Sequence, residues 1–290
     1  MDIGIGLPSS IPGTRPEVLL RWAVDAEEAG FSSLGVLDRV VYPNYEPFVA
    51  LSAVAAVTKR VRLVTTVLIA PVRINAALLA KQAASLDRLS NGRFVFGTGL
   101  GGRDDDYESG GVPTRGRGKW HDLALEEMRR VWSGASYGLA GGVGPEPSQP
   151  GGPVLIIGGR ALAVFRRAAK YADGWVGGVG SPDSFPPLAA MLDDAWAELG
   201  RSGKPRKLAL AFYALGPDAV GDARRYVESY SGYLGPERTA VIAAAAATTP
   251  TMIREYIDQY VGFGCDELIF VPCSNEPRQV ELLAAASGLV

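Results

Sequence analysis

The stretch from Arg60 to Asp106 reads RVRLVTTVLIAPVRINAALLAKQAASLDRLSNGRFVFGTGLGGRDDD, and it predicts a strand, a helix and a second strand. Residues 61–68 are rich in apolar and β-branched side chains, which is typical of a parallel strand covered on both faces. Asn75 can cap the helix that follows, and Gly92 can end it, because glycine is favoured where the chain leaves a helix with positive φ. Residues 93–96 form the next short strand. One such unit implies further copies along the chain.

Those copies are present, because short apolar runs alternate with helical patterns along the whole sequence. Residues 217–247 are helical and longer than a standard crossover, which predicts an insertion after the seventh strand. We therefore predict one α/β domain over residues 1–290, a single (β/α)₈ TIM barrel. A doubly wound open sheet is the alternative, although the dinucleotide fingerprint is missing at the first strand–helix turn. The expected strands lie near residues 3–7, 34–37, 61–68, 93–96, 154–157, 175–176, 207–215 and 267–271.

Composition excludes several classes of protein. Apolar residues make up 47% of the 290 residues and the net charge is -2, so a full core is possible and no basic patch predicts nucleic-acid binding. No apolar run is long enough to span a bilayer, and the first ten residues do not resemble a signal peptide. With only 2 cysteines, a disulfide framework is not expected and we predict a cytoplasmic protein.

In a TIM barrel, ligand-binding residues lie at the carboxyl ends of the strands. Gly158-Gly159-Arg160 stands between a strand and a helix, where free N–H groups can hold a phosphate; a tight turn is the alternative. Gly177-Gly178 repeats this pattern more weakly. Asp38 follows the second strand, as a loop cap or as a ligand contact. Residues 104–106 are three aspartates, which are typical of a solvated loop tip, with a loose cation site as the alternative.

The remaining reactive residues give no known catalytic set. His121 is the 1 histidine of the chain, and a structural role suits it better than catalysis. Cys273 is read as a small apolar filler. The sequence has no G-x-S-x-G elbow, and its single histidine leaves little room for a Ser-His-Asp set. It has no zinc-ligand spacing either, so no metal is predicted.

The motifs of the chain resemble the bacterial luciferase-like family of flavin- and F420-dependent oxidoreductases. The resemblance covers nearly the whole sequence in the right order. It rests on RVRLVTTV, RINAALLAKQAASLDRLSNGRFVFGTGLG, AEEAGFSSL, PVLIIGGR, ADGWV, TPTMIREY and GFGCDELIF.

The resemblance implies F420, or FMN as the alternative, bound at the carboxyl face of a TIM barrel that is usually dimeric. In relatives the ring rests on the third strand, often on a bulge with a non-prolyl cis peptide, which falls here near Thr66-Val67. The glycine-rich residues 99–118 would form a lid. The expected cofactor contacts are Asp38, Thr66, Val67, Gly99, Gly158, Gly159, Arg160, Gly177 and Gly178.

One departure from the family pattern concerns the proton donor. Many relatives carry Asp-His after the second strand, whereas this chain has Asp38-Arg39, and arginine cannot act as a general acid near neutral pH. Asp106 matches an acidic family position that is proposed to donate a proton in some F420 enzymes. The expected catalytic residues are therefore Asp106 and Asp38.

The resemblance implies an oxidoreductase that uses reduced F420 or FMN to reduce or oxygenate a small organic substrate. F420 is favoured because the RIN and GTGLGG segments are most similar to F420 relatives. The alternative is a flavin- or F420-binding protein that has lost catalysis.

Overall fold

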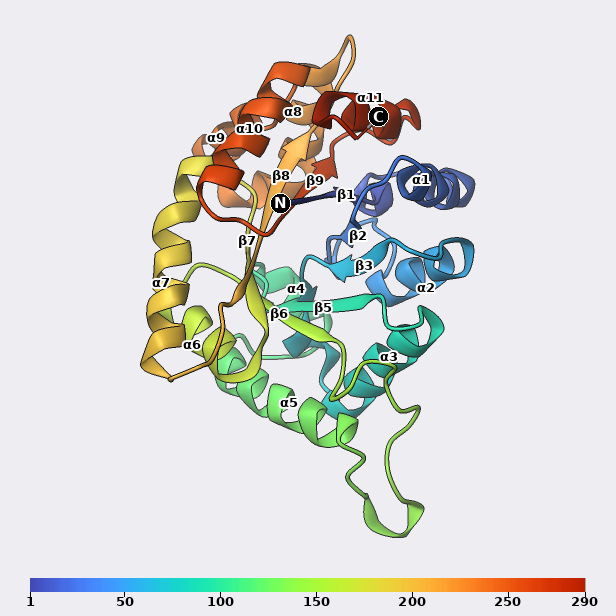
Figure 1. The fold of residues 1–290 in the computed structure, drawn as a ribbon, viewed down its shortest axis with the longest axis vertical. Helices are drawn as coiled ribbons and strands as arrows, with labels where there is room; N and C mark the ends of the chain where they lie inside the picture. Colours follow the sequence, from blue (N-terminus) through green and yellow to red (C-terminus); the bar gives the residue numbers. More distant parts are fainter. Residues whose placement is uncertain (290) are drawn as a thin grey trace.

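Parallel strands close into an eight-stranded barrel in the computed structural model, which describes residues 1–289 (Figure 1). The order is β3-β2-β1-β9-β8-β7-β6-β5-β4, and β3 also pairs with β5, which completes the ring. The predicted TIM barrel is confirmed, and the open sheet is wrong. The strands are β1 Asp2–Gly6, β2 Ser33–Val36, β3 Arg62–Thr65, β4 Leu68–Ile69, β5 Phe94–Gly99, β6 Val154–Gly158, β7 Gly174–Gly177, β8 Arg206–Tyr213 and β9 Glu267–Pro272.

The third barrel strand differs from the prediction, because it is divided into β3 and β4. Between the two halves the Thr66-Val67 peptide is cis, at the position that the family resemblance implies. The Thr66 hydroxyl turns back and donates a hydrogen bond to the Val36 carbonyl at 2.9 Å, so it holds the break against β2. The break displaces the backbone at the carboxyl end of the barrel, where ligands bind in this fold.

Helices cover the outside of the barrel (Figure 1), and the helix expected after Asn75 begins where its capping signal predicts. The Asn75 side chain accepts a hydrogen bond from the Leu78 amide at 2.9 Å, and Gly92 has φ +78 beyond the end of that helix. The helices that alternate with the strands are α1 Pro16–Glu28, α2 Pro47–Val57, α3 Ala76–Leu89, α5 Arg117–Trp132, α6 Leu162–Tyr171, α7 Phe185–Glu198, α10 Pro250–Gly262 and α11 Arg278–Ser287.

Three further segments shape the carboxyl face. The insertion after β8 consists of α8 Ala219–Ser231, the short turn η5 Gly232–Leu234 and α9 Pro236–Ala244. Residues 104–109, expected within a loop, form the short helix α4 Asp104–Ser109, and the 3₁₀ turn η2 Ala70–Arg73 follows β4. Insertion and α4 lie above the strand ends, in position to enclose a ligand.

Apolar side chains form two connected cores. Val64, Val95, Ile156 and Ile269 fill the barrel interior, as expected for a packed TIM barrel. A larger cluster, which includes Trp22, packs between the strands and the helices. None of the helices within residues 1–289 is both long enough and apolar enough to cross a membrane.

Candidate functional site

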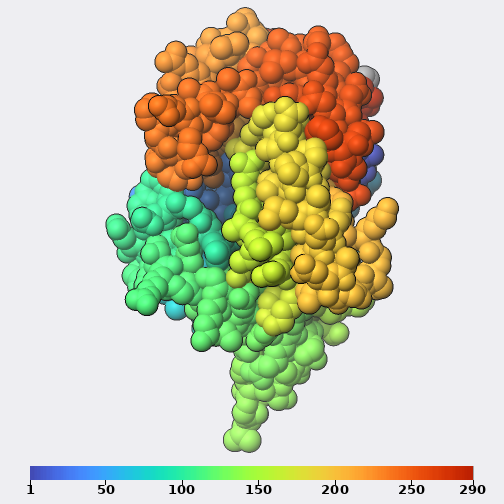
Figure 2. All heavy atoms as spheres, turned by 90° about the vertical axis from the view of Figure 1, so that its left-hand side faces the viewer, coloured from blue at the N-terminus to red at the C-terminus, as the bar shows by residue number. Residues whose placement is uncertain are grey.

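A hollow opens at the carboxyl ends of the strands. Figure 2 shows it between the teal segment after β5, the yellow-green segments that follow β6 and β7, and the orange insertion, with blue N-terminal residues at its floor. At one side the hollow continues into a cavity of about 170 Å³. The residues that line this cavity are Leu37, Asp38, Arg39, Thr66, Val67, Ile69, Gly101, Gly102, Arg103, Asp106, Tyr230 and Tyr233.

Val67 forms an apolar floor beside the cis peptide and packs against two glycines. A Cβ on Gly99 would lie 2.8 Å from Val67 Cγ2, and a Cβ on Gly158 would lie 2.7 Å from Val67 Cγ1. Any larger residue at either position would displace the valine. The structure thus brings three predicted cofactor contacts together, and the packing of Val67 explains why two of them are glycine.

Asp38 is buried at the end of β2 and is held by three donors. Arg73 donates to it from Nη1 at 2.6 Å and from Nη2 at 3.1 Å, and the Ile69 amide donates at 2.7 Å. Burial raises the pKa of Asp38, and the neighbouring guanidinium of Arg73 opposes that rise. The bidentate pair ties the end of β2 to β4 and η2. Asp38 and Ile69, which this link holds together, both line the cavity.

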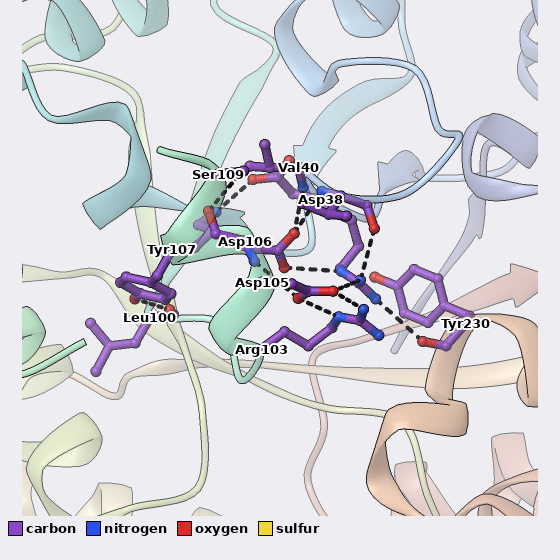
Figure 3. A network of polar contacts seen from close by, with 12 residues as sticks. Asp38, Val40, Leu100, Arg103, Asp105, Asp106, Tyr107, Ser109 and Tyr230 are labelled. Carbon is purple, nitrogen blue, oxygen red and sulfur yellow. Dashed lines mark hydrogen bonds and ion pairs between the residues drawn. The ribbon is translucent and has the colours of Figure 1, made fainter. Parts of the chain in front are cut away.

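Asp106 is fully buried in α4, so the expectation of a solvated loop tip is wrong for this residue. Its carboxylate accepts hydrogen bonds from Arg39 Nε at 3.0 Å and from the amides of Val40 and Val41 at 2.8 Å each (Figure 3). In all three contacts the carboxylate is the acceptor. These bonds fasten α4 to the loop after β2, and they favour a positioning role, while proton donation by Asp106 stays a prediction.

Arg39, which stands where many relatives carry histidine, is buried among tyrosines. Its guanidinium carbon lies 5.4 Å, 5.6 Å and 5.7 Å from the ring centroids of Tyr42, Tyr230 and Tyr233. With its ion pair to Asp106, the side chain therefore joins the loop after β2, α4 and the insertion.

Sequence reasoning missed Arg73, Tyr230 and Tyr233 as parts of the site. The one signal that the sequence offered is the charge of Arg39, because an arginine that becomes buried needs partners. It could not indicate which of the chain's 11 tyrosines would supply the aromatic contacts.

The segment after β6 offers free backbone donors. Within the described part of the chain, the N–H groups of residues 159–163 have no backbone or side-chain acceptor. Gly159 has φ +135, a conformation that other residues rarely adopt. Together with the start of α6, which has no acidic residue in its first turn, this arrangement suits an anion.

The other predicted phosphate contacts divide into two kinds. Arg160 is exposed beside these amides, and its Nη2 donates to Ser184 Oγ at 2.8 Å. Gly178 faces open space, since a Cβ there would meet nothing within 4 Å. Gly177 is packed instead, because its Cβ would lie 3.0 Å from the Trp175 ring. Gly177 thus serves the core, whereas Arg160 and Gly178 lie open to a ligand.

The remaining titratable residues lie apart from this site. His121 is buried in α5, its Nε2 lies 3.2 Å from Thr98 Oγ1, and burial lowers its pKa to about 3. Burial raises the pKa of the Cys273 thiol, as expected for an apolar filler. Residues 1–289 contain no group of three or more His, Cys, Asp or Glu side chains that could hold a metal ion.

Comparison with known protein families decides the assignment. Residues 1–259 match the family of luciferase-like monooxygenases. The chain belongs to this family. The luciferase-like resemblance of the sequence motifs is thereby confirmed, and the family that the chain belongs to is one of enzymes.

One relative shows how similar the chain is to known sequences. An uncharacterized protein of Mycobacterium tuberculosis is 36% identical over 178 residues, which cover 57% of this chain and 61% of that protein. This chain thus aligns with about three fifths of the length of that relative.

Two solved structures share the fold over nearly the full length. An F420-dependent secondary alcohol dehydrogenase in complex with an F420-acetone adduct has a TM-score of 0.79, 19% identity, and coverage of 100% of this chain and 98% of its own. The oxygenating constituent of 3,6-diketocamphane monooxygenase from Pseudomonas putida, in complex with FMN, has a TM-score of 0.75, 16% identity, and coverage of 100% and 96%. At these identities the likeness concerns the fold.

Proposed function

We propose that this enzyme binds reduced F420, with FMN as the alternative, and uses it to reduce or oxygenate a small organic substrate. The observation that carries the proposal is the pairing of two features on one barrel face. Unpartnered amides at residues 159–163 can hold a phosphate, and the apolar surface around Val67 can support a flavin-type ring. When bound, the cofactor supplies the hydride transfer or the activation of oxygen.

The protein's own residues orient and enclose that cofactor. Thr66 and Val67 would support the ring, and the start of α6 with Arg160 would bind the phosphate. Asp38 would fix the wall beside the ring through its bidentate bond with Arg73. Asp106 would hold α4 over the site through Arg39, which excludes water from the cavity.

Two solved structures support both cofactors equally, since one contains an F420 adduct and the other FMN. The sequence segments RIN and GTGLGG, at residues 73–75 and 97–102, favour F420. The cavity of about 170 Å³ beside the ring position supports a small substrate.

We further propose that the enzyme is a cytoplasmic homodimer. Both cysteines are free and buried, which suits a reducing compartment. Helix α2 exposes Val49 and Val57, by 66% and 43%, on a helix that is apolar on every side. Such a helix is typical of one that is covered by a partner.

The test is a fluorescence titration of the purified protein with F420 and with FMN, followed by turnover assays with the reduced form of each. We expect saturable binding of F420 with a Kd at least tenfold below that for FMN, about 1.4 kcal/mol. Tighter binding of FMN would select the alternative. Absence of saturable binding of either compound would reject the proposal.

A further inference from the structure

The turn between the two insertion helices projects one aromatic side chain over the cavity. Gly232–Leu234 forms the 3₁₀ turn η5, and Gly235, with φ +87, begins α9. Tyr233 and Leu234 stand between these two glycines, and of the two it is Tyr233 that lines the cavity, with Thr66 and Val67. Glycines on both sides let such a turn change its backbone angles without moving the helices.

Two neighbouring guanidinium groups contact the ring of Tyr233. Arg103, from the segment after β5, lies with its guanidinium carbon 4.7 Å from the ring centroid, and Arg39, from the loop after β2, lies at 5.7 Å. Each arginine is fixed in turn by an ion pair, Arg103 with Asp105 and Arg39 with Asp106. The ring therefore bridges two segments that meet at the mouth of the cavity.

The phenol hydroxyl of Tyr233 lies beside Gly102, the residue before Arg103. A Cβ on Gly102 would lie 3.4 Å from the Tyr233 hydroxyl oxygen, so the tyrosine reaches across to the glycines that follow β5. None of the hydrogen bonds found within residues 1–289 involves this hydroxyl, and Tyr233 is 47% exposed. It is thus held by its ring alone, and it can swing away when the cation–π contacts are released.

We propose that Tyr233 is the gate of the cavity beside the proposed cofactor ring and the residue that limits the size of the substrate admitted there. This inference rests on the proposed function, since it takes the cavity as the substrate site. Arg39 and Arg103 are positioning residues, because they act on the substrate only through the tyrosine ring. In the position seen here the Tyr233 hydroxyl lies beside Gly102, and the side chain lines the same cavity as Thr66 and Val67.

The first test measures solvent access to a bound cofactor. Iodide quenching of F420 and FMN fluorescence, and the rate of cofactor release, are compared for the parent, Tyr233→Phe and Tyr233→Ala. We expect Tyr233→Ala to raise both the quenching constant and the release rate by about tenfold, the effect of losing two cation–π contacts. Tyr233→Phe keeps the ring and should match the parent.

A matched control exists elsewhere on the surface. Tyr137 also lies under a guanidinium, with Arg130 4.1 Å from its ring centroid, but it does not line the cavity. Tyr137→Ala should therefore leave quenching and release unchanged. Equal quenching in the parent and in Tyr233→Ala would overturn the gate, even though cofactor binding itself would then stand.

The second test needs no cofactor, so it separates the gate from the proposed function. Hydrogen exchange of the backbone amides in residues 100–106 is measured in the cofactor-free protein. We expect Tyr233→Ala to raise exchange there by about tenfold, because the segment loses its cation–π contact with the insertion, while Tyr137→Ala has no effect. Unchanged exchange would overturn the gate, whichever cofactor binds.

Discussion

Three hydrogen-bond donors converge on the carboxylate of Asp106, and these contacts determine the expected effect of replacing it. Asp106→Asn leaves one acceptor oxygen and turns an NH₂ group toward a donor, so α4 should shift against Arg39. We expect kcat/KM to fall by up to about 10²-fold, as for a misplaced active-site wall. For a residue that positions and does not donate a proton, the pH–rate profile should keep its basic limb.

The competing role of Asp106 makes a different prediction. A proton donor would lose the basic limb together with about 10²–10⁴ in rate. Asp104→Asn is the control, since Asp104 is exposed in the same helix. Loss of the basic limb in Asp106→Asn alone would establish Asp106 as the acid and contradict the positioning role.

His121 should make the stability of the fold depend on pH. Burial lowers its pKa from 6.5 to about 3, so between these values the unfolded chain binds a proton that the folded protein excludes. Stability is then fully present above pH 6.5 and is lost as the pH falls toward 3, by up to about 1.4 kcal/mol per pH unit. Denaturant unfolding of the parent and of His121→Gln at several pH values checks this, and parallel pH slopes would contradict it.

Among the secondary-structure elements, the start of α6 allows a substitution with opposite expected effects on the stability of the helix and on cofactor binding. Ala161 is the residue before the helix, with φ -80 and ψ 149, and its side chain is no cap. Ala161→Asp places an N-cap carboxylate on the free amides and should stabilise the helix by about 0.5–2 kcal/mol. The same carboxylate repels the phosphate, so the cofactor Kd should rise at least about tenfold.

Thermal melting and fluorescence titration of that variant, with Ala161→Ser as the uncharged control, give the two measurements. Ala161→Ser should also cap the helix, while it weakens binding much less than the aspartate. Unchanged affinity in Ala161→Asp would remove the phosphate from the start of α6.

The sequence predicted those elements that carry their own local signals. Asn75 caps α3 and Gly92 follows its end, and both signals lie within the helix's own segment. Helix α4 was missed because three aspartates after a glycine run favour a loop by composition. What holds Asp106 in this helix is Arg39, 67 residues away in the sequence. The residues alone predicted one continuous third strand, because its break depends on contacts with β2. The family resemblance did imply a bulge with a cis peptide near Thr66-Val67, where the break lies.

For the whole molecule, the rule that ligand sites of a TIM barrel lie at the carboxyl ends of its strands brought the candidate residues to one face. The rule did not predict which residues contact them. Asp38, Thr66, Val67 and Asp106 do line one cavity, because parallel strands bring their carboxyl ends together. The partners were not predictable, since Arg73 lies 35 residues from Asp38, and Arg39 reaches the Tyr230 carbonyl over 191 residues. Such pairings are set by the closed fold and by the insertion that covers it.

The proposed homodimer is argued from the surface of α2. This helix is apolar on every side, and Ala53 lies near the middle of its exposed face. Glu46 precedes the helix and Lys59 follows it, so two copies packed antiparallel about a twofold axis would bring opposite charges together. The antiparallel helix dipoles would also be complementary. We therefore expect a dimer in which α2 packs against α2 of a second copy.

Ala53→Glu tests this arrangement, because it places a charge against its own copy at the centre of the contact. Analytical ultracentrifugation at micromolar concentration should show a dimer for the parent and a monomer for the variant, with unchanged secondary structure. Val261→Glu is the control, since Val261 is 53% exposed on α10, outside this face. A dimer that persists in Ala53→Glu would place the interface on another face, and a monomeric parent would contradict the dimer itself.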